Sequence, residues 1–159
     1  MNSIHELLDN SARKYPDKSA IIFDDLRISF AELLKKTEFL SNLIQEKIST
    51  GNVISILCEN SPFFIISYFS VLKSGCIAHI IPPSISDFNL KEQIKETNTE
   101  MIFSTRSFEQ KLNRTQLTKK IFFVENTIFS KVNSNDFCGN RFNETASIIF
   151  TSGTTSKPK

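Results

Sequence analysis

The sequence predicts an α/β protein in three layers, with helices on both faces of a mostly parallel sheet. Two observations lead to this prediction. Short apolar runs alternate with stretches of helical periodicity along the chain. The runs at 53–58 and 76–81 are apolar at nearly every position, which is typical of strands buried on both faces. Because crossovers between parallel strands are right-handed, the helices between these runs are expected to cover the sheet.

The first elements are a helix and a hairpin. Ser3 and Glu6 have the spacing of a capping box, which predicts a helix from there to about Lys14. Strands are predicted at 20–23 and 27–29, joined by a turn at the sequence "DD". The second of these strands is expected to run back along the first and form a hairpin.

A second capping box predicts the next helix. Ser29 and Glu32 repeat the three-residue spacing, and apolar side chains follow at helical intervals. This helix is expected to end before Gly51, where the strand at 53–58 follows. The sequence therefore places the first long helix directly ahead of the first buried strand.

A proline and a glycine delimit the helix after that strand. Asn60 or Ser61 is expected to cap it, with Pro62 at the first helical position, where a missing N–H has no cost. Gly75 is placed to end it in the left-handed conformation. The remaining elements are predicted as a strand at 76–81, a helix at 88–97, a strand at 101–105, a helix opening at 107–110, and strands at 121–125 and 147–150, with a polar, irregular stretch at 126–145.

Composition limits the classes of function. The 159 residues are 40% hydrophobic and 23% charged, which fits one globular domain. The net charge of +2 gives no field that would attract nucleic acid, so no nucleic-acid partner is expected. The sequence has no transmembrane run and no secretory signal at its start, so a cytoplasmic location is predicted.

Cysteine and histidine residues do not suggest a metal site. Cys58, Cys76 and Cys138 lack paired spacing and are expected to be reduced thiols. His79 lies three residues after Cys76 on a predicted strand, so the two face opposite sides and cannot share a metal. His79 is interpreted as a core or strand-end histidine and His5 as a surface residue.

The familiar nucleotide-binding glycine motifs and the G-x-S-x-G hydrolase motif are missing from the sequence. A small basic cluster is interpreted as a solvated helix face: Lys111, Arg114, Lys119 and Lys120.

The final stretch "TSGTTSKPK" carries the chemistry of a phosphate site. It offers hydroxyl groups, a glycine that permits close approach of the backbone, and two lysines. The strand at 147–150 would bring this stretch to the carboxyl edge of the sheet, where open α/β folds bind ligands. Composition alone leaves two alternatives open, a phosphate-binding loop and a flexible polar tail.

The same stretch closely resembles the signature [ST]-S-G-[ST]-T-G-x-P-K of the adenylate-forming, or AMP-binding, superfamily. Lys157 fills the variable place and Ser156 departs from the family glycine. The stretches "ISFAEL", "NSPFFIISYFSVLKSGCIAHIIPPS" and "ETASIIFTSGTT" resemble further family blocks in the same order. The resemblance implies an ATP phosphate-binding loop made of Thr151, Ser152, Gly153, Thr154, Thr155, Ser156 and Lys159.

The resemblance also implies a reaction. Family members use ATP and Mg²⁺ to convert a carboxylate into an acyl-adenylate and pyrophosphate, and the acyl group then usually passes to the thiol of coenzyme A or of a carrier protein. The stretch "IIPPSISDFNLKEQIKE" is more similar to acyl-CoA synthetases than to amino-acid-activating domains of peptide synthetases. An acyl-CoA synthetase is therefore the first expectation, and an amino-acid-activating domain the alternative.

Family proteins are longer, so residues 1–159 resemble the N-terminal part of an AMP-binding domain whose C-terminal remainder is absent. That remainder holds the family's catalytic and metal-binding residues; none are expected in this chain, and the isolated chain is expected to be inactive. A complementary C-terminal polypeptide is expected if the gene is split. A non-catalytic remnant or binding module, and an unrelated phosphate-binding α/β protein, are further alternatives.

Overall fold

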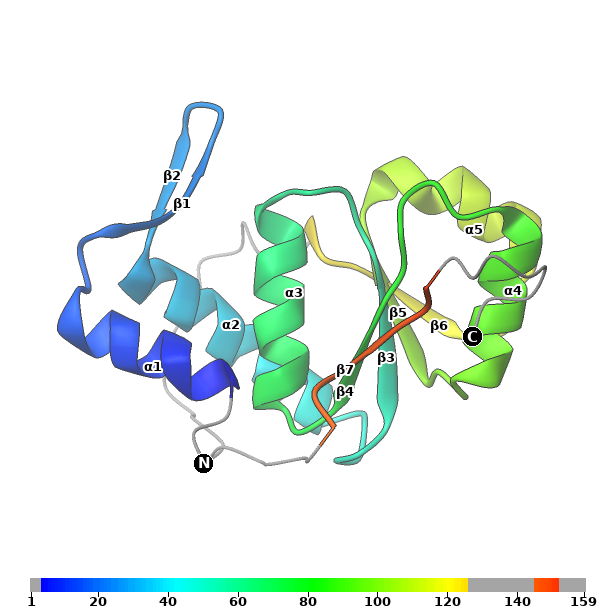
Figure 1. The fold of residues 1–159 in the computed structure, drawn as a ribbon, viewed down its shortest axis with the longest axis horizontal. Helices are drawn as coiled ribbons and strands as arrows, with labels where there is room; N and C mark the ends of the chain where they lie inside the picture. Colours follow the sequence, from blue (N-terminus) through cyan, green and yellow to red (C-terminus); the bar gives the residue numbers. More distant parts are fainter. Residues whose placement is uncertain (1–3, 126–144, 152–159) are drawn as a thin grey trace.

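The computed structural model describes residues 4–125 and 145–151. Within these ranges the chain forms a five-stranded parallel sheet between two helical layers, and a separate antiparallel hairpin (Figure 1). This architecture confirms the predicted fold class. In chain order the elements are α1 (Ile4–Lys14), β1 (Ser19–Phe23), β2 (Leu26–Ser29), α2 (Phe30–Gln45), β3 (Val53–Leu57), α3 (Pro62–Lys73), β4 (Ile77–Ile80), α4 (Asp87–Glu96), β5 (Met101–Ser104), the 3-10 turn η1 (Arg106–Phe108), α5 (Glu109–Thr115), β6 (Lys120–Phe123) and β7 (Ser147–Ile149).

The sheet has the strand order β6-β5-β3-β4-β7, and every neighbouring pair is parallel. The chain passes from β3 through α3 to β4, then through α4 back across β3 to β5. Right-handed crossovers in opposite directions put α3 and α4 on opposite faces. Figure 1 shows α1, α2 and α3 on one side of the sheet and α4 and α5 on the other.

The central strand β3 supplies both cores. Ile54 and Ile56 belong to the apolar cluster packed with the α1–α3 layer. Leu57 belongs to the second cluster, with residues of α4 and α5. All three side chains are fully buried. The period-two alternation of a strand explains this division, because successive side chains point to opposite faces. The sheet is therefore covered on both faces, as the continuous apolar run predicted.

The capping box that opens α2 is confirmed. The Ser29 hydroxyl accepts the Glu32 backbone N–H at 3.2 Å, and the Glu32 carboxylate accepts the Ser29 N–H at 2.8 Å. Hydrogen bonding of the Glu32 carboxylate to the Ser29 backbone N–H, and then to the Ser29 side chain, lowers the pKa of the Glu32 carboxyl. The helix ends at Gln45, before Gly51, as predicted. Gly51, with φ of 88°, donates its N–H to the Gly75 carbonyl at 2.9 Å, just ahead of β3.

The start of α3 differs from the start of α2. Ser61 occupies the N-cap position and Pro62 the first turn, as predicted, but the Ser61 side chain makes no capping hydrogen bond. The Ser61 Oγ is buried and has no hydrogen-bond partner in the described part of the chain. Gly75 follows the helix with φ of 79°, which confirms its predicted role as the left-handed terminator. The Ser3 end of the other predicted capping box lies outside the described residues.

One expectation for α1 is wrong. His5 was predicted at the surface, but it is 5% exposed. It shares a buried stripe with Leu8 and Ala12, at the spacing that places residues on one helix face, so its position in the helix outweighs its polarity. Burial, and then the nearby Lys73 charge, lower the pKa of the His5 ring.

An ion pair joins α1 to α3 within this layer. The Lys73 Nζ lies 2.6 Å from the Asp9 carboxylate and 3.8 Å from the Glu38 carboxylate of α2. The Lys73 side chain is 3% exposed, and a buried charge is costly unless it is paired. Acidic partners from two neighbouring helices provide that pairing. This cluster connects the three helices on one face of the sheet.

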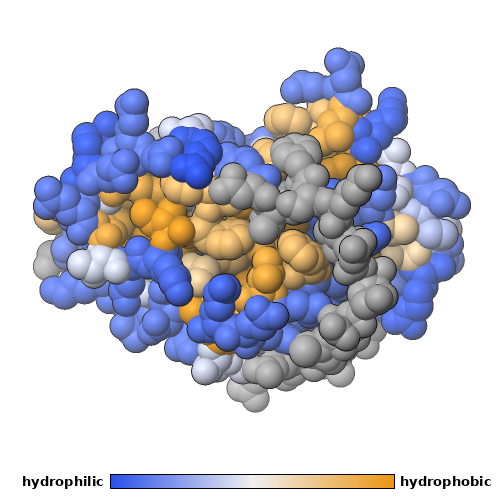
Figure 2. Space-filling model, turned by 180° about the vertical axis from the view of Figure 1, so that it is seen from behind, coloured by the Kyte–Doolittle hydropathy of each residue, from blue (hydrophilic) through white to orange (hydrophobic). Residues whose placement is uncertain are grey.

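The hairpin stands out from the helical layer, as Figure 1 shows. Asp24, with φ of 50°, makes the tight turn between β1 and β2. Ile22, Phe23 and Leu26 are large apolar residues that the hairpin leaves exposed. Seen from behind in Figure 2, hydrophobic side chains gather near this projection and across the middle of the face.

Candidate functional site

The edge strand β7 carries the start of the predicted phosphate loop. It pairs in parallel with β4, with Ile148 opposite His79 and Ile149 opposite Ile80. The carboxyl end of β7 therefore lies at the same sheet edge as the carboxyl ends of the other strands, as the sequence predicted. Thr151 follows this end and is exposed. The other predicted loop residues lie outside the described part of the chain: Ser152, Gly153, Thr154, Thr155, Ser156 and Lys159.

The crossover connections reverse their direction across the sheet between β3 and β4. The connection after β3 leads to α3 on one face, and the connection after β4 leads to α4 on the other. In open α/β sheets, ligands bind beside the carboxyl ends of strands whose connections diverge in this way. Because β7 is next to β4, Thr151 lies beside this crevice position.

Contacts at both ends hold β7 against the sheet. At its start, the Ala78 N–H donates to the Ala146 carbonyl at 3.0 Å, and the Tyr68 hydroxyl lies 3.0 Å from the Ser147 hydroxyl. At its end, the Phe150 ring meets the His79 ring edge-on, with centroids 5.3 Å apart and an interplanar angle of 65°. The residue before Thr151 is thus packed against the neighbouring strand.

His79 belongs to a buried line of polar side chains. It is fully buried, which confirms its interpretation as a core histidine. The Ser55 hydroxyl lies 2.7 Å from the His79 Nδ1 and 2.6 Å from the Thr99 hydroxyl. The Thr99 hydroxyl lies 2.7 Å from that of Thr97, which donates to the Gln93 carbonyl in the last turn of α4 at 2.8 Å. The line therefore connects α4 to β4 through β3.

Burial lowers the pKa of the His79 ring to about 4. The Gln93 side chain acts in the opposite direction, although neither the His79 Nε2 nor the Gln93 Oε1 has a hydrogen-bond partner of normal geometry among the described residues. Burial has the larger effect on the pKa because the ring has no exposed surface. The His79 ring is therefore neutral at neutral pH.

A second polar cluster lies at the carboxyl ends of β3, β5 and β6, and the sequence analysis did not find it. Glu59 accepts hydrogen bonds from the Thr105 hydroxyl at 2.7 Å and from the Ser107 hydroxyl. The Arg106 N–H donates to the Glu125 carboxylate at 2.6 Å. The signal that could have revealed the cluster is that each of these polar residues closely follows the carboxyl end of a strand.

The electrostatics of this cluster do not favour phosphate. Burial acts to raise the pKa of the Glu59 carboxyl, but the hydrogen bonds from Ser107 and Thr105 outweigh it, and the pKa is lowered. The Arg106 guanidinium is paired with Glu109 at 2.7 Å and lies over the Phe123 ring. Two carboxylates therefore occupy the β3–β5–β6 part of the edge, and they would repel a polyanion. The β4–β7 part is the more suitable for phosphate.

The cysteines in the described ranges are free thiols in apolar surroundings. Cys58 and Cys76 are both buried, and burial raises the pKa of the Cys58 thiol to about 12. The Cys76 Sγ is directed to the Ser49 carbonyl at 3.6 Å, away from the partners of His79. Cys138 lies outside the described residues. Across 4–125 and 145–151, no three His, Cys, Asp or Glu side chains are grouped to hold a metal ion.

The basic residues near α5 contact the protein itself. The Lys111 Nζ donates to the Ile85 carbonyl, and the Arg114 guanidinium pairs with the Asp87 carboxylate at 3.1 Å. These contacts attach α5 to the start of α4. The interpretation as a solvated face is correct for Arg114, which is exposed, and incomplete for Lys111, which is partly buried.

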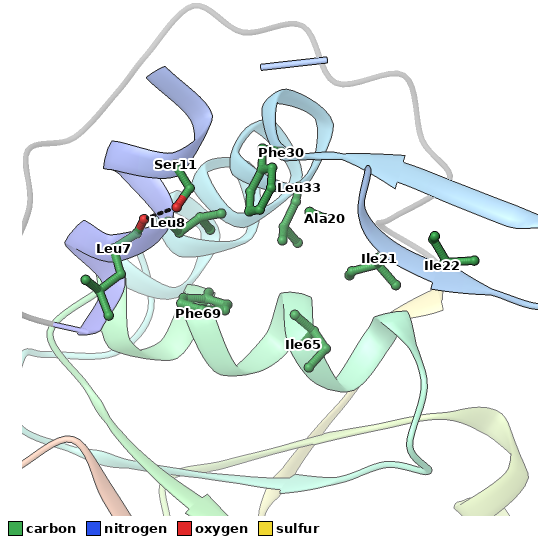
Figure 3. Close-up of a pocket in the computed structure, with 10 residues that line it drawn as sticks. All are labelled: Leu7, Leu8, Ser11, Ala20, Ile21, Ile22, Phe30, Leu33, Ile65 and Phe69. Carbon is green, nitrogen blue, oxygen red and sulfur yellow. Dashed lines mark hydrogen bonds between the residues drawn. The ribbon is translucent and has the colours of Figure 1, made fainter. Parts of the chain in front are cut away.

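An open groove of about 430 Å³ lies on the side of α3 that faces away from the sheet (Figure 3). Its lining comes from α1, β1, α2 and α3, and is almost wholly apolar. The polar side chain shown in it, Ser11, donates its hydroxyl to the Leu7 carbonyl at 2.8 Å. The groove offers no charged group to bind phosphate.

None of the helices in the described ranges is long and apolar enough to cross a membrane.

Comparison with known proteins identifies related sequences. The family described as AMP-binding enzyme matches residues 8–159. Tyrocidine synthase 1 of Brevibacillus parabrevis is 26% identical over 99% of this chain, and bacitracin synthase 2 of Bacillus licheniformis is 28% identical over 99%. This chain spans 15% and 6% of the lengths of those two proteins.

Solved structures share the fold. The N-terminal subdomain of Klebsiella oxytoca NpsA aligns with a TM-score of 0.81 and 21% identity, over 100% of this chain and 41% of that one. The o-succinylbenzoate CoA synthetase of Bacillus subtilis, bound to its acyl-adenylate intermediate, aligns with a TM-score of 0.80 and 21% identity, over 96% of this chain and 40% of that one. The five-stranded sheet with its two helical layers therefore matches the N-terminal subdomains of adenylate-forming enzymes.

Proposed function

The chain belongs to the AMP-binding enzyme family, and from this membership we propose that residues 1–159 form the N-terminal part of an enzyme that activates a carboxylate with ATP. The observation that supports the proposal is the sequence motif "TSGTTSKPK", whose first residue, Thr151, follows β7 at the carboxyl edge of a parallel sheet. The remainder of the AMP-binding domain, with the acyl pocket and the catalytic residues, would lie beyond Lys159.

The proposed reaction is an in-line displacement at phosphorus. A carboxylate oxygen of the substrate attacks the α-phosphorus of ATP, a new P–O bond forms, and the bond to the bridging oxygen breaks. Acyl-adenylate and pyrophosphate are the products. Such a step depends on positioning and on neutralising charge, because the nucleophile is already ionised.

The loop after β7 would hold the departing pyrophosphate. The hydroxyls of Thr151, Ser152, Thr154, Thr155 and Ser156 are hydrogen-bond donors suited to phosphate oxygens. Gly153 allows the backbone to approach them closely, and the Lys159 ammonium opposes their charge. Mg²⁺, bound to the phosphates, would supply the remaining positive charge. Ser156, in place of the family glycine, would add one hydroxyl.

Two acceptors for the activated acyl group follow from the relatives. Tyrocidine synthase 1 and bacitracin synthase 2 favour an amino-acid-activating domain that passes its product to a carrier-protein thiol. The stretch "IIPPSISDFNLKEQIKE" and the structural likeness to a CoA synthetase favour an acyl-CoA synthetase that uses coenzyme A. The proposal of carboxylate activation holds for both types of enzyme, because both begin by forming an adenylate of their carboxylic acid.

The test is ATP–pyrophosphate exchange, measured on the protein at its natural length with amino acids and fatty or aromatic acids as separate substrates. Exchange with any acid supports the proposal. Exchange with none, by a folded protein, would contradict it. The class of acid that supports exchange decides between the two acceptor types.

The two lysines of the loop provide a matched pair of variants. Lys159→Ala is expected to lower kcat/KM for ATP by about 100-fold, the effect of losing one group that stabilises charge in the transition state. Lys157→Ala removes the same charge from the variable place of the motif, to which the family signature assigns no fixed residue, and is expected to lower kcat/KM by less than about threefold. Equal losses in both variants would mean that only net charge matters, which contradicts the assigned roles.

A further inference from the structure

The end of β7 depends on few contacts within the described residues. The strand has three residues and pairs with β4 on one side, with its other edge unpaired in the described sheet. Ile149 is 64% exposed, so one face of the strand contributes little burial. The contacts of its opposite face therefore decide where its carboxyl end lies.

That opposite face is the one occupied by His79. Register partners in a parallel pair point to the same side, so Ile148 shares the face of His79, and Phe150 follows two residues later on the same face. The ring contact between His79 and Phe150 agrees with this placement. Thr151 is the next residue, so the contact lies one peptide away from the loop.

The position of the His79 ring is itself set by the buried polar line. Its Nδ1 is hydrogen-bonded to Ser55, which is also bonded to Thr99, and these groups are all fully buried. A buried hydrogen bond fixes the orientation of a ring more firmly than apolar packing alone, because breaking it leaves polar groups without partners. The His79 ring is thereby held against Phe150.

We propose that His79 is a positioning residue for ATP: through its edge-on contact with Phe150 it fixes the carboxyl end of β7, and with it Thr151 and the start of the phosphate-binding loop. The inference rests on the proposed function. His79 itself does not touch substrate, and it takes no part in proton transfer. Its role is to hold Thr151 in one position, which lowers the entropic cost of binding the phosphates there.

The test compares the affinity for magnesium ATP, measured by titration calorimetry on the protein at its natural length, among three variants. His79→Ala and Phe150→Ala each remove one ring of the pair. Each is expected to weaken ATP binding by about threefold to tenfold, the worth of an edge-on aromatic contact. The affinity of the double variant for ATP is expected to equal that of the single variant with the lower affinity, because all three variants lose the same ring contact.

Two further variants separate positioning from stability. His79→Phe keeps a ring beside Phe150 but loses the hydrogen bond to Ser55, which retains Thr99 as its partner. It is expected to be less stable than the wild type, yet to bind ATP more tightly than His79→Ala. Tyr68→Phe removes the hydroxyl contact at the other end of β7 and is expected to change ATP affinity by less than about twofold, as a control for general loosening of the strand.

The outcomes are distinct. Additive losses in the double variant, unchanged ATP affinity in His79→Ala, or equal weakening in His79→Phe and His79→Ala would each overturn the positioning role. If His79→Ala does not fold, Phe150→Ala and His79→Phe still decide the question, because both should weaken ATP binding and His79→Phe, which keeps a ring beside Phe150, should weaken it less. A folded wild-type protein that binds no magnesium ATP would overturn the proposed function and this inference with it.

Discussion

At the scale of single residues, burial determines how His79 behaves with pH. Its folded pKa of about 4 lies below the ordinary value of 6.5, because burial disfavours the charged ring. Between these two values the unfolded chain binds a proton that the folded protein does not. The free energy of unfolding therefore falls as the pH decreases through this window, and the loss is complete near pH 4.

This direction of the pH dependence gives a measurable prediction. From pH 7 to pH 4 the wild type is expected to lose up to about 3 kcal/mol more stability than His79→Phe, which has no titrating ring at this position. Urea unfolding at a series of pH values measures the difference, and the variant serves as the reference for His5 and all other groups that titrate in both proteins. If the free energy of unfolding falls equally with pH in the two proteins, protonation of His79 does not cause the loss of stability.

The sequence predicted some residue roles and missed others for physical reasons. The prediction of a core or strand-end position for His79 is confirmed, since the structure buries the residue fully. The surface position predicted for His5 is wrong, because the residue lies on the buried stripe of α1. Glu59 was not singled out, since its contacts with Thr105 and Ser107 join residues far apart in the sequence.

At the scale of elements, the two serine caps show how local sequence determines helix starts. Ser29 satisfies the backbone N–H of Glu32, and Glu32 in turn satisfies that of Ser29. Ser61 occupies the same position on α3, but its hydroxyl forms no capping bond. Capping boxes can be predicted from spacing because both partners lie within one turn. The missing bond at Ser61 could not be predicted, because it depends on how the chain enters the helix.

The caps provide a matched stability test. Ser29→Ala is expected to lower the free energy of unfolding by about 1 kcal/mol, the usual worth of a capping side chain. Ser61→Ala should lower it by less than about 0.5 kcal/mol, because it removes a buried hydroxyl that has no partner among the described residues. Urea unfolding of the two variants measures both values. A larger loss for Ser61→Ala than for Ser29→Ala would contradict the assignment of the caps.

At the scale of the whole molecule, the sheet carries two cores, and α4 and α5 complete the second of them. The alternation of apolar runs and helices was enough to predict the parallel sheet and its two helical layers. The strand order β6-β5-β3-β4-β7 could not be predicted, because it depends on long-range pairing that leaves no local pattern. The location of Thr151 beside β4 follows from that order.

The proposed division of the enzyme predicts how the isolated polypeptide behaves. A protein ending at Lys159 is expected to show no ATP–pyrophosphate exchange, because the acyl pocket and the catalytic residues would lie in the remainder. The protein at natural length, assayed beside it with the same acids, is the control. Exchange by the 159-residue polypeptide alone would contradict the proposed division.

The pairing of β7 with β4 has a consequence for the order of folding. The strands β3 to β6 are continuous in the chain and are synthesised first, so they can assemble while the polypeptide is still emerging from the ribosome. The last strand must then cross from beyond β6 to the far edge of the sheet, and this long-range closure is slow compared with local pairing. The edge that leads to Thr151 would accordingly be the last part of this sheet to form, and a partly synthesised chain would have the strands β3 to β6 in place but no strand on the outer side of β4.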